Sequence, residues 1–337
     1  MKEESSSVPL IKRMSNNRNN SMLGDEEMSE VVIDDIIGFL DQQGYNFNFT
    51  GNKADKVNDF STLFNYKEGS LTFVSSLNDF GDYIRMFEDK KIQLIITGFK
   101  EKNYDCFENT IQVEKPKSVF FSILEHFFNE DSNDDSITNN PEAYKRRSFI
   151  SDKATIGRNV KIGVGSVIEG NVTIGDDTVI HHNVVIRAKS HIGKNCVILS
   201  GAVIGESGFN PLKDTNDKRN LVKHYGGVRI EDDVHIGDQC AISKGTIEDT
   251  IIKTGVKLNK QVVIAHNVIV GEDTVVTTPV FVGGSVKIGK GCHIAATTIR
   301  NQCNIGDGAR LGLGSVVVKD VQAGETVIGV PARPMDR

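Results

Sequence analysis

Two residues eighteen positions apart have types that suit group-transfer chemistry: His266 in "QVVIAHNV" and Gly284 in "FVGGSVKIG". An imidazole, whose ordinary pKa is about 6.5, can take up a proton near neutral pH. A glycine lets a substrate approach the backbone, and its N–H can stabilise a developing oxyanion. Each residue also has a structural interpretation, as a solvated turn histidine or as a turn glycine with a positive φ angle.

Other polar residues near His266 are candidates for orienting it or for contacting a substrate. Asn267 and Asn259 can each hydrogen-bond the second ring nitrogen, or they can be ordinary turn residues that tolerate a left-handed φ angle. Glu248 lies eighteen residues before His266. It is a further candidate, although an interruption of the repeat at "IEDT" disturbs that count.

These residues lie in a repeat of six residues, which must position them. The repeat places an isoleucine at every sixth position from residue 150 to residue 204, and the period resumes at 230 after an insertion at 206–229. Such a period predicts a parallel β-helix, in which each hexapeptide turns one apolar side chain inward and successive coils cover one another. With three hexapeptides to a coil, a coil has about 18 residues, and Gly284 stacks directly beside His266.

The rest of the chain differs in texture from the repeat. Residues 1–30 read as a flexible tail, 31–128 as a small N-terminal α/β domain, and 129–148 as a polar linker before a β-helix at 149–337. The insertion at 206–229 interrupts the stack, and loops of this kind usually carry binding residues. The alternative is that this loop is a passive part of the surface. Its candidates for gripping a substrate across a subunit boundary are Phe209, Asn210, His224 and Tyr225.

Composition excludes several classes of function. The chain has 337 residues and a formal net charge of −6, without a basic cluster, so a nucleic-acid partner is not expected. No run of about 18 apolar residues predicts a membrane span. The five cysteines form no C-x-x-C pair, which favours free thiols in the cytoplasm over disulfides or zinc. The scattered histidines do not predict a metal site, with adjacent His181 and His182 as the remaining candidates.

Longer motifs carry a family resemblance. "GESGFN", "LVKHYGGVRIEDDVHIG" and "KGTIEDTIIKTGVKLNKQVVIAHNVIVGEDT" resemble the left-handed β-helix acyltransferases, and in particular the UDP-3-O-(3-hydroxyacyl)glucosamine N-acyltransferases of lipid A synthesis. The resemblance implies a homotrimer with His266 as the base and the Gly284 N–H as the oxyanion donor. It also implies a nucleotide-binding N-terminal domain, with Phe73 stacking on the base or, alternatively, packing in the core.

Three departures from that family shift the expected substrate. The chain ends in "GVPARPMDR", as acetyltransferases that use coenzyme A do, whereas the lipid A enzymes continue into helices that dock acyl carrier protein. Gln302 stands where the family has a second histidine, and Ser76 where it has an asparagine. These departures favour a branch that N-acylates dTDP-linked amino-deoxysugars, such as the anthrose-pathway enzyme.

The sequence therefore predicts an acyl-CoA-dependent N-acyltransferase acting on a nucleotide-linked amino-deoxysugar. Coenzyme A, as the thioester co-substrate, is expected along the C-terminal coils at Gly284, Ala295, Gly312 and Gly314. The alternatives are the lipid A N-acyltransferase with acyl carrier protein as donor, and a non-catalytic β-helix scaffold. A further open question is whether His266 acts as a base or only positions the amine.

Overall fold

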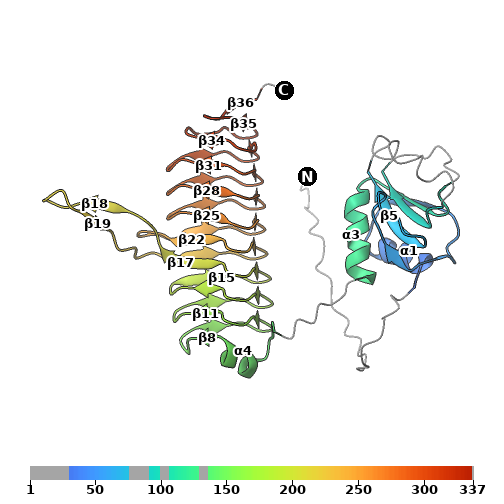
Figure 1. Ribbon diagram of the computed structural model, residues 1–337, viewed down its shortest axis with the longest axis horizontal. Helices are drawn as coiled ribbons and strands as arrows, with labels where there is room; N and C mark the ends of the chain where they lie inside the picture. Colours follow the sequence, from blue (N-terminus) through green and yellow to red (C-terminus); the bar gives the residue numbers. More distant parts are fainter. Residues whose placement is uncertain (1–29, 76–90, 99–105, 129–135, 336–337) are drawn as a thin grey trace, which may run out of the picture. The chain divides into compact units, whose positions relative to one another are not determined.

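The computed structural model describes residues 30–75, 91–98, 106–128 and 136–335 (Figure 1). Contacts divide the chain into two compact units, Met1–Ser132 and Asn133–Arg337. The expected tail up to residue 29, the candidate Ser76 and residues 129–135 of the expected linker lie outside the described residues.

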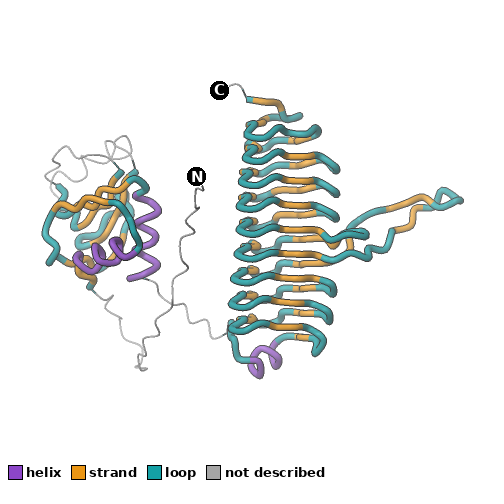
Figure 2. Tube along the Cα trace, turned by 180° about the vertical axis from the view of Figure 1, so that it is seen from behind, coloured by secondary structure: helices purple, strands orange, loops and turns teal. Residues whose placement is uncertain are grey.

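The described part of the N-terminal unit combines a five-stranded sheet with the helices α1 (Ile33–Gln42) and α3 (Pro116–Phe127) (Figures 1 and 2). The helices bury their apolar faces in one core with the sheet, whose strand order is β2-β7-β6-β5-β4. Only the pair β2–β7 is antiparallel within that sheet. The strands of this unit are β1 (Val31–Val32), β2 (Phe47–Thr50), β3 (Lys56–Val57), β4 (Asp59–Phe60), β5 (Ser70–Val74), β6 (Leu94–Thr97) and β7 (Thr110–Val113).

The second unit is a parallel β-helix with three sheets, which confirms the fold class predicted from the six-residue period (Figure 1). The nine-stranded sheet contains β8 (Phe149–Ile150), β11 (Val167–Ile168), β14 (Val185–Ile186), β17 (Val203–Ser207), β22 (Ala241–Lys244), β25 (Val262–Ile264), β28 (Val280–Val282), β31 (Thr298–Ile299) and β34 (Val316–Val317). The eight-stranded sheet contains β9 (Thr155–Ile156), β12 (Thr173–Ile174), β15 (Ser190–Ile192), β20 (Val228–Ile230), β23 (Thr250–Ile252), β26 (Ile269–Val270), β29 (Lys287–Ile288) and β32 (Asn304–Ile305).

The ten-stranded sheet completes the helix. It contains β10 (Lys161–Ile162), β13 (Val179–Ile180), β16 (Val197–Ile198), β21 (His235–Ile236), β24 (Lys257–Leu258), β27 (Val275–Val276), β30 (His293–Ile294), β33 (Arg310–Leu311), β35 (Thr326–Ile328) and β36 (Arg333–Pro334). Helix α4 (Pro141–Arg147) lies at the end of the stack that begins with β8 (Figure 1).

The register of the strands follows from the repeat length. Val263 pairs with Phe281, eighteen residues on, whereas Phe281 pairs with Thr298, seventeen residues on, because one coil is a residue shorter. The inward isoleucines and valines form one continuous core along the helix. The turns use residues such as Asn159 and Asp177, with φ angles of 54° and 59°, because short polar side chains tolerate this left-handed region.

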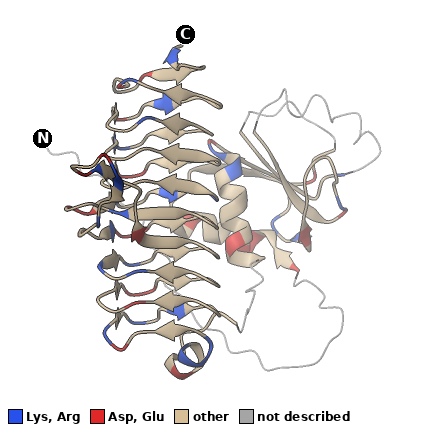
Figure 3. Ribbon diagram, turned by 60° about the vertical axis from the view of Figure 1, so that its left-hand side comes forward, with Lys and Arg blue, Asp and Glu red and all other residues tan. Residues whose placement is uncertain are grey.

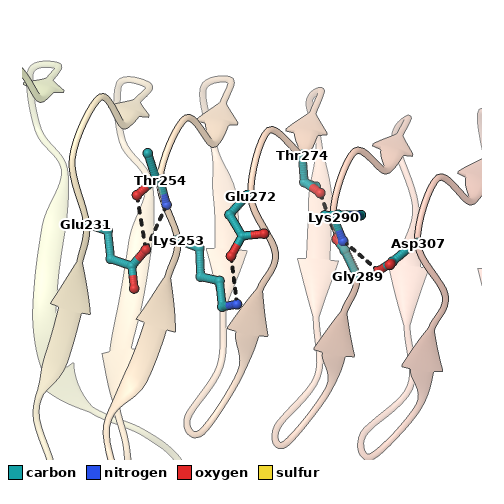
Figure 4. Close-up of polar contacts among 8 residues, drawn as sticks. All are labelled: Glu231, Lys253, Thr254, Glu272, Thr274, Gly289, Lys290 and Asp307. Atoms are coloured by element: carbon teal, nitrogen blue, oxygen red, sulfur yellow. Dashed lines mark hydrogen bonds and ion pairs between the residues drawn. The ribbon is translucent and has the colours of Figure 1, made fainter. Parts of the chain in front are cut away.

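Polar contacts between successive coils connect the turns (Figure 4). Lys253 Nζ lies 2.8 Å from Glu272 Oε1 in the next coil, and the Lys290 N–H donates to Asp307 Oδ1 at 3.0 Å. Both signs of charge are interspersed along the stack (Figure 3). Because these pairs are exposed, each adds little stability, and the apolar core carries most of it.

The insertion forms an antiparallel hairpin of β18 (Pro211–Lys213) and β19 (Arg219–Leu221). It leaves the stack after β17 and returns before β20, and it projects away from the helix (Figures 1 and 2). The stem of the hairpin thus begins at the corner that follows the nine-stranded sheet, which is the corner where His266 also lies.

Candidate active site

His266 and Gly284 occupy the same corner in neighbouring coils, as their spacing predicts. His266 follows β25 and Gly284 follows β28, and these strands pair in register. A Cβ atom added at Gly284 would lie only 2.8 Å from both Cε1 and Nε2 of His266. The absence of a side chain at this glycine therefore leaves the Nε2 edge of the imidazole room to meet a ligand.

Asn267 fixes the tautomer of His266. Its Oδ1 accepts a hydrogen bond from the backbone N–H of Thr246 at 3.0 Å, and its Nδ2 donates to the carbonyl oxygen of Glu248 at 3.1 Å. These two backbone partners define which end of the amide is oxygen. The same Oδ1 lies 3.0 Å from His266 Nδ1, which must then carry the hydrogen and leave Nε2 unprotonated in the neutral ring.

Two threonines that sequence reasoning missed support this arrangement. The hydroxyl oxygen of Thr250 accepts from the Asn267 N–H at 2.9 Å, and that of Thr246 lies 3.4 Å from His266 Nδ1. Both belong to the stretch "KGTIEDT", where the repeat slips. The slip in the repeat is visible in the sequence and indicates irregular geometry. The hydrogen-bond partners of the two threonine hydroxyl groups cannot be read from it.

The predicted oxyanion donor is already engaged. The Gly284 N–H donates to Asn301 Oδ1 at 3.1 Å, the same type of coil-to-coil contact that Lys290 makes with Asp307. The role of the Gly284 N–H as oxyanion donor stays a prediction, and it requires this hydrogen bond to be exchanged. Asn301 was missed because it lies 17 residues on, in the coil that is one residue short.

The insertion brings a second imidazole to the site. The rings of His224 and His266 lie 5.2 Å apart, centroid to centroid, at an interplanar angle of 81°. His224 is only 2% exposed, so its ring packs against His266 in this structure, and its expected contact with a substrate stays a prediction. Phe209 and Tyr225, by contrast, are 78% and 60% exposed. Asn210 is half-buried, and its carbonyl oxygen accepts from the Val222 N–H at 2.9 Å.

Two predicted neighbours of His266 lie elsewhere or act differently. Asn259 follows β24 of the ten-stranded sheet, at a different corner of the coil, and its side chain accepts from the Lys260 N–H at 2.8 Å. It therefore cannot orient His266. Glu248 contributes only its main-chain carbonyl, to Asn267, and its side chain is exposed.

Of the four expected coenzyme residues, Gly284 lies beside His266, whereas Ala295, Gly312 and Gly314 lie apart from it. Ala295 and Gly312 follow β30 and β33, which pair in the ten-stranded sheet. The Gly314 N–H donates to Ala296 O at 3.0 Å, so these residues share one corner, whereas His266 lies at the next corner of the coil.

Phe73 is partly buried and packs against the hydrophobic core of the N-terminal unit. Its ring lies 4.8 Å from that of Phe120 on α3, centroid to centroid, and 6.3 Å from that of Phe121. The observed packing corresponds to the structural alternative for this aromatic residue.

A cavity of about 620 Å³ is lined by residues of β28, β31 and β34 in the nine-stranded sheet and by the turn that follows β31. Asn301 and Gln302 form its end nearest Gly284, and the Gln302 N–H donates to the Gly284 carbonyl at 2.9 Å. Its lining residues are Phe281, Thr298, Ile299, Arg300, Asn301, Gln302, Val316 and Val318.

The other reactive side chains are poorly suited to chemistry. Burial raises the pKa values of the Cys196 and Cys240 thiols to about 11, which keeps them protonated and unreactive. Within the described ranges, no group of three histidine, cysteine, aspartate or glutamate residues is placed to hold a metal ion. His182 Nδ1 instead accepts from the Val164 N–H at 3.0 Å. None of the helices that the structure describes is long and apolar enough to cross a membrane.

A comparison with models of known protein families identifies part of the six-residue repeat. A family model described as bacterial transferase hexapeptide (six repeats) matches residues 153–188 and 174–206. Residues 153–206 of the β-helix thus consist of hexapeptide repeats similar to those of bacterial transferases. The structure is similar to LpxA from Acinetobacter baumannii, with a TM-score of 0.51 and 29% identity, over 56% of this chain and 72% of that one.

Similarity to proteins of stated activity covers part of the chain. UDP-3-O-acylglucosamine N-acyltransferase from Hahella chejuensis is 48% identical over 95 residues, which are 28% of this chain and 27% of the relative. The Bordetella parapertussis enzyme of the same name is 35% identical over 135 residues, 39% of this chain and 37% of the relative. The chain thus spans roughly a quarter to two fifths of the length of these relatives.

These relatives overturn two predictions. The expected dTDP-linked amino-deoxysugar is wrong, and the anthrose branch is unsupported, because the relatives are named for UDP-3-O-acylglucosamine. The same name belongs to the alternative that the sequence analysis gave, the N-acyltransferase of lipid A synthesis. The expected coenzyme A donor is wrong with it, since the resemblance pairs the alternative with acyl carrier protein.

Proposed function

We propose that this protein is an N-acyltransferase that transfers an acyl group from acyl carrier protein to the amine of UDP-3-O-acylglucosamine, in the cytoplasmic part of lipid A synthesis. One observation carries the proposal: the Asn267-fixed tautomer of His266 turns an unprotonated Nε2 toward the space that Gly284 leaves open. The names of the relatives supply the substrate.

The proposed chemistry is proton removal coupled to attack on a thioester. His266 Nε2 takes a proton from the sugar amine, whose nitrogen forms a bond with the thioester carbonyl carbon. The tetrahedral intermediate then collapses, the carbon–sulfur bond breaks, and the thiolate leaves and is protonated. Hydrogen bonding from Nδ1 to Asn267 Oδ1, 3.0 Å away, stabilises the imidazolium that forms.

The oxyanion donor in this mechanism requires a rearrangement. The Gly284 N–H becomes available to the carbonyl oxygen once Asn301 rotates its Oδ1 away. The 620 Å³ cavity adjoins Asn301 and has an aromatic and aliphatic lining that includes Phe281 and Val316. We assign it to the acyl chain, since apolar walls favour burial of hydrocarbon.

A homotrimer is part of the proposal. The outward positions of the nine-stranded sheet carry Phe149, Val263 and Phe281, which are 63%, 37% and 45% exposed. A row of exposed apolar residues along one sheet face is suited to packing against a second copy of the chain. The exposed residues Phe209 and Tyr225 of the insertion then lie free to contact a neighbouring subunit or a substrate.

The test is turnover with defined donors. The full chain is incubated with UDP-3-O-(3-hydroxyacyl)glucosamine and either 3-hydroxyacyl carrier protein or the matching acyl-CoA, and the N-acylated sugar is measured by mass spectrometry. We expect product with the carrier protein and a loss of about 10²–10⁴-fold in kcat for His266→Ala, the usual contribution of a general base. An unchanged kcat in that variant would show that His266 only positions the amine. Absence of product with every donor would reject the function.

A further inference from the structure

The insertion places the His224 ring against the His266 imidazole. Edge-to-face contact brings the two ring centroids to 5.2 Å, with the planes at 81°. His224 is 2% exposed and enters the stack from the stem of a hairpin whose neighbouring residues, Phe209 and Tyr225, are exposed. A buried imidazole at the base of an exposed hairpin needs a physical reason.

One ring nitrogen of His224 fastens the hairpin. Its Nδ1 lies 3.2 Å from the Gly208 nitrogen and 3.1 Å from the carbonyl oxygen of Lys244. An unprotonated Nδ1 accepts from the first, and a protonated Nδ1 donates to the second, so one of the two bonds forms at a time. The first bond ties the histidine to Gly208 in the hairpin stem, and the second ties it to Lys244 on β22 in the next coil.

The position of the other ring nitrogen, Nε2, is energetically unfavourable. His224 Nε2 is buried and has no hydrogen-bond partner among the residues that the structure describes. Burying an unpaired polar atom is unfavourable. An asparagine would offer the Nδ1-type contact without this atom, and a phenylalanine would offer a ring without it. Of these three residue types, only histidine provides both a nitrogen at the Nδ1 position and a ring that contacts His266.

The packing around the two rings is tight. A Cβ atom added at Gly208 would lie 2.7 Å from Cε1 of His224 and 3.1 Å from Cδ2 of His266, so the backbone of the stem is pressed against both rings. The His266 ring thus has the His224 ring and the hairpin stem as neighbours, and Gly284 lies next to its Cε1 and Nε2 atoms.

We propose that His224 is a positioning residue for His266: its ring holds the imidazole with Nε2 facing Gly284, which makes the hairpin insertion part of the active site. This inference rests on the proposed function for its kinetic consequence, because only a catalytic His266 makes its position matter to kcat. The contact itself is independent of the reaction.

Two variants separate the ring contact of His224 with His266 from the hydrogen bond that its Nδ1 makes. His224→Asn keeps a group near the Nδ1 position and removes the ring, whereas His224→Phe keeps a ring and removes both nitrogens. His293→Asn, an exposed position on β30, is the matched control. Steady-state kcat and KM of the full chain are measured with 3-hydroxyacyl carrier protein and UDP-3-O-(3-hydroxyacyl)glucosamine, and melting temperatures are recorded for all four proteins.

We expect His224→Asn to lose at least tenfold more in kcat than His224→Phe, with KM unchanged and the control equal to wild type. Equal losses in the two variants, or a larger loss in His224→Phe, would overturn the positioning role and leave His224 as an anchor of the hairpin. A melting temperature that follows kcat across the variants would overturn it as well.

A second measurement does not depend on turnover. The rate at which diethyl pyrocarbonate modifies His266 is followed by mass spectrometry of the peptide that contains it. We expect a severalfold change in that rate for His224→Asn and a rate near wild type for His224→Phe; equal rates in all proteins would contradict the contact. If wild type shows no acyl transfer, the proposed function fails, and this measurement still decides whether His224 controls the His266 ring.

Discussion

Replacing Gly284 by alanine is the sharpest test of the site geometry. The new Cβ would lie 2.8 Å from Cε1 and Nε2 of His266, and ordinary contact begins near 3.4 Å, so the ring must move by about 0.6 Å or turn aside. The φ angle of Gly284 is not in the left-handed region, so alanine can adopt this backbone conformation. A displacement approaching 1 Å at a catalytic group costs about 10²-fold in rate.

The assay is N-acyl transfer under saturating donor and acceptor, with melting temperature measured in parallel. We expect kcat to fall about 10²-fold while the melting temperature changes little, because the half-buried His266 can swing outward without opening the core. Gly38→Ala is the matched control, since a Cβ there meets nothing within 4 Å. A kcat within about threefold of wild type in Gly284→Ala would refute the argument that Nε2 must face this glycine.

Three further predictions follow from contacts in the β-helix. Asn267→Gly, which retains the positive φ of 60°, should lower kcat about 10- to 100-fold, because a hydrogen bond to an imidazolium contributes about 1.5–3 kcal/mol; unchanged kinetics would remove Asn267 from the mechanism. Asn301→Ala should raise kcat about 2- to 10-fold, because the Gly284 N–H no longer has to exchange a partner worth about 0.5–1.5 kcal/mol; a fall in kcat at constant KM would instead show that Asn301 assists the reaction itself. His235 has its pKa lowered by burial and by nearby Lys257, so the folded state stays neutral where the unfolded chain binds a proton, and stability is lost as pH falls below about 6.5. The decrease in melting temperature between pH 7.5 and pH 5.5 should therefore be larger for wild type than for His235→Gln. Equal decreases in the two proteins would contradict this assignment of the pH dependence to His235.

The sequence was most informative where geometry repeats. A period of six residues determines which side chains point inward, and three hexapeptides per coil determine which residues stack, so the neighbourhood of His266 and Gly284 followed by counting. Counting along the chain also explains the failure for Asn301, because a coil one residue short changes every later correspondence. Asn259 was misplaced for a related reason: proximity in sequence was taken as proximity in space, although seven residues cross a corner of the coil.

Features outside the repeat could not be predicted in this way. The burial of His224 depends on how the hairpin stem folds back on the helix, and no periodicity governs that path. Phe73 has the same type whether it stacks on a nucleotide base or on Phe120, so its role depends on tertiary packing. The partners of Thr246 and Thr250 likewise arise from an irregular turn, where small changes of backbone angle redirect a hydroxyl group.

Helix α4 has a consequence for self-assembly. A β-helix exposes, at its first coil, strand edges that could template the addition of another chain and lead to fibres. Here Thr138 pairs with Ile162 of β10 in the antiparallel sense, which a further parallel coil cannot extend, and Tyr144 of α4 is 6% exposed within the helix core. The segment before the first repeat thus covers the edge of β10 with a pairing that the parallel addition of another chain cannot continue.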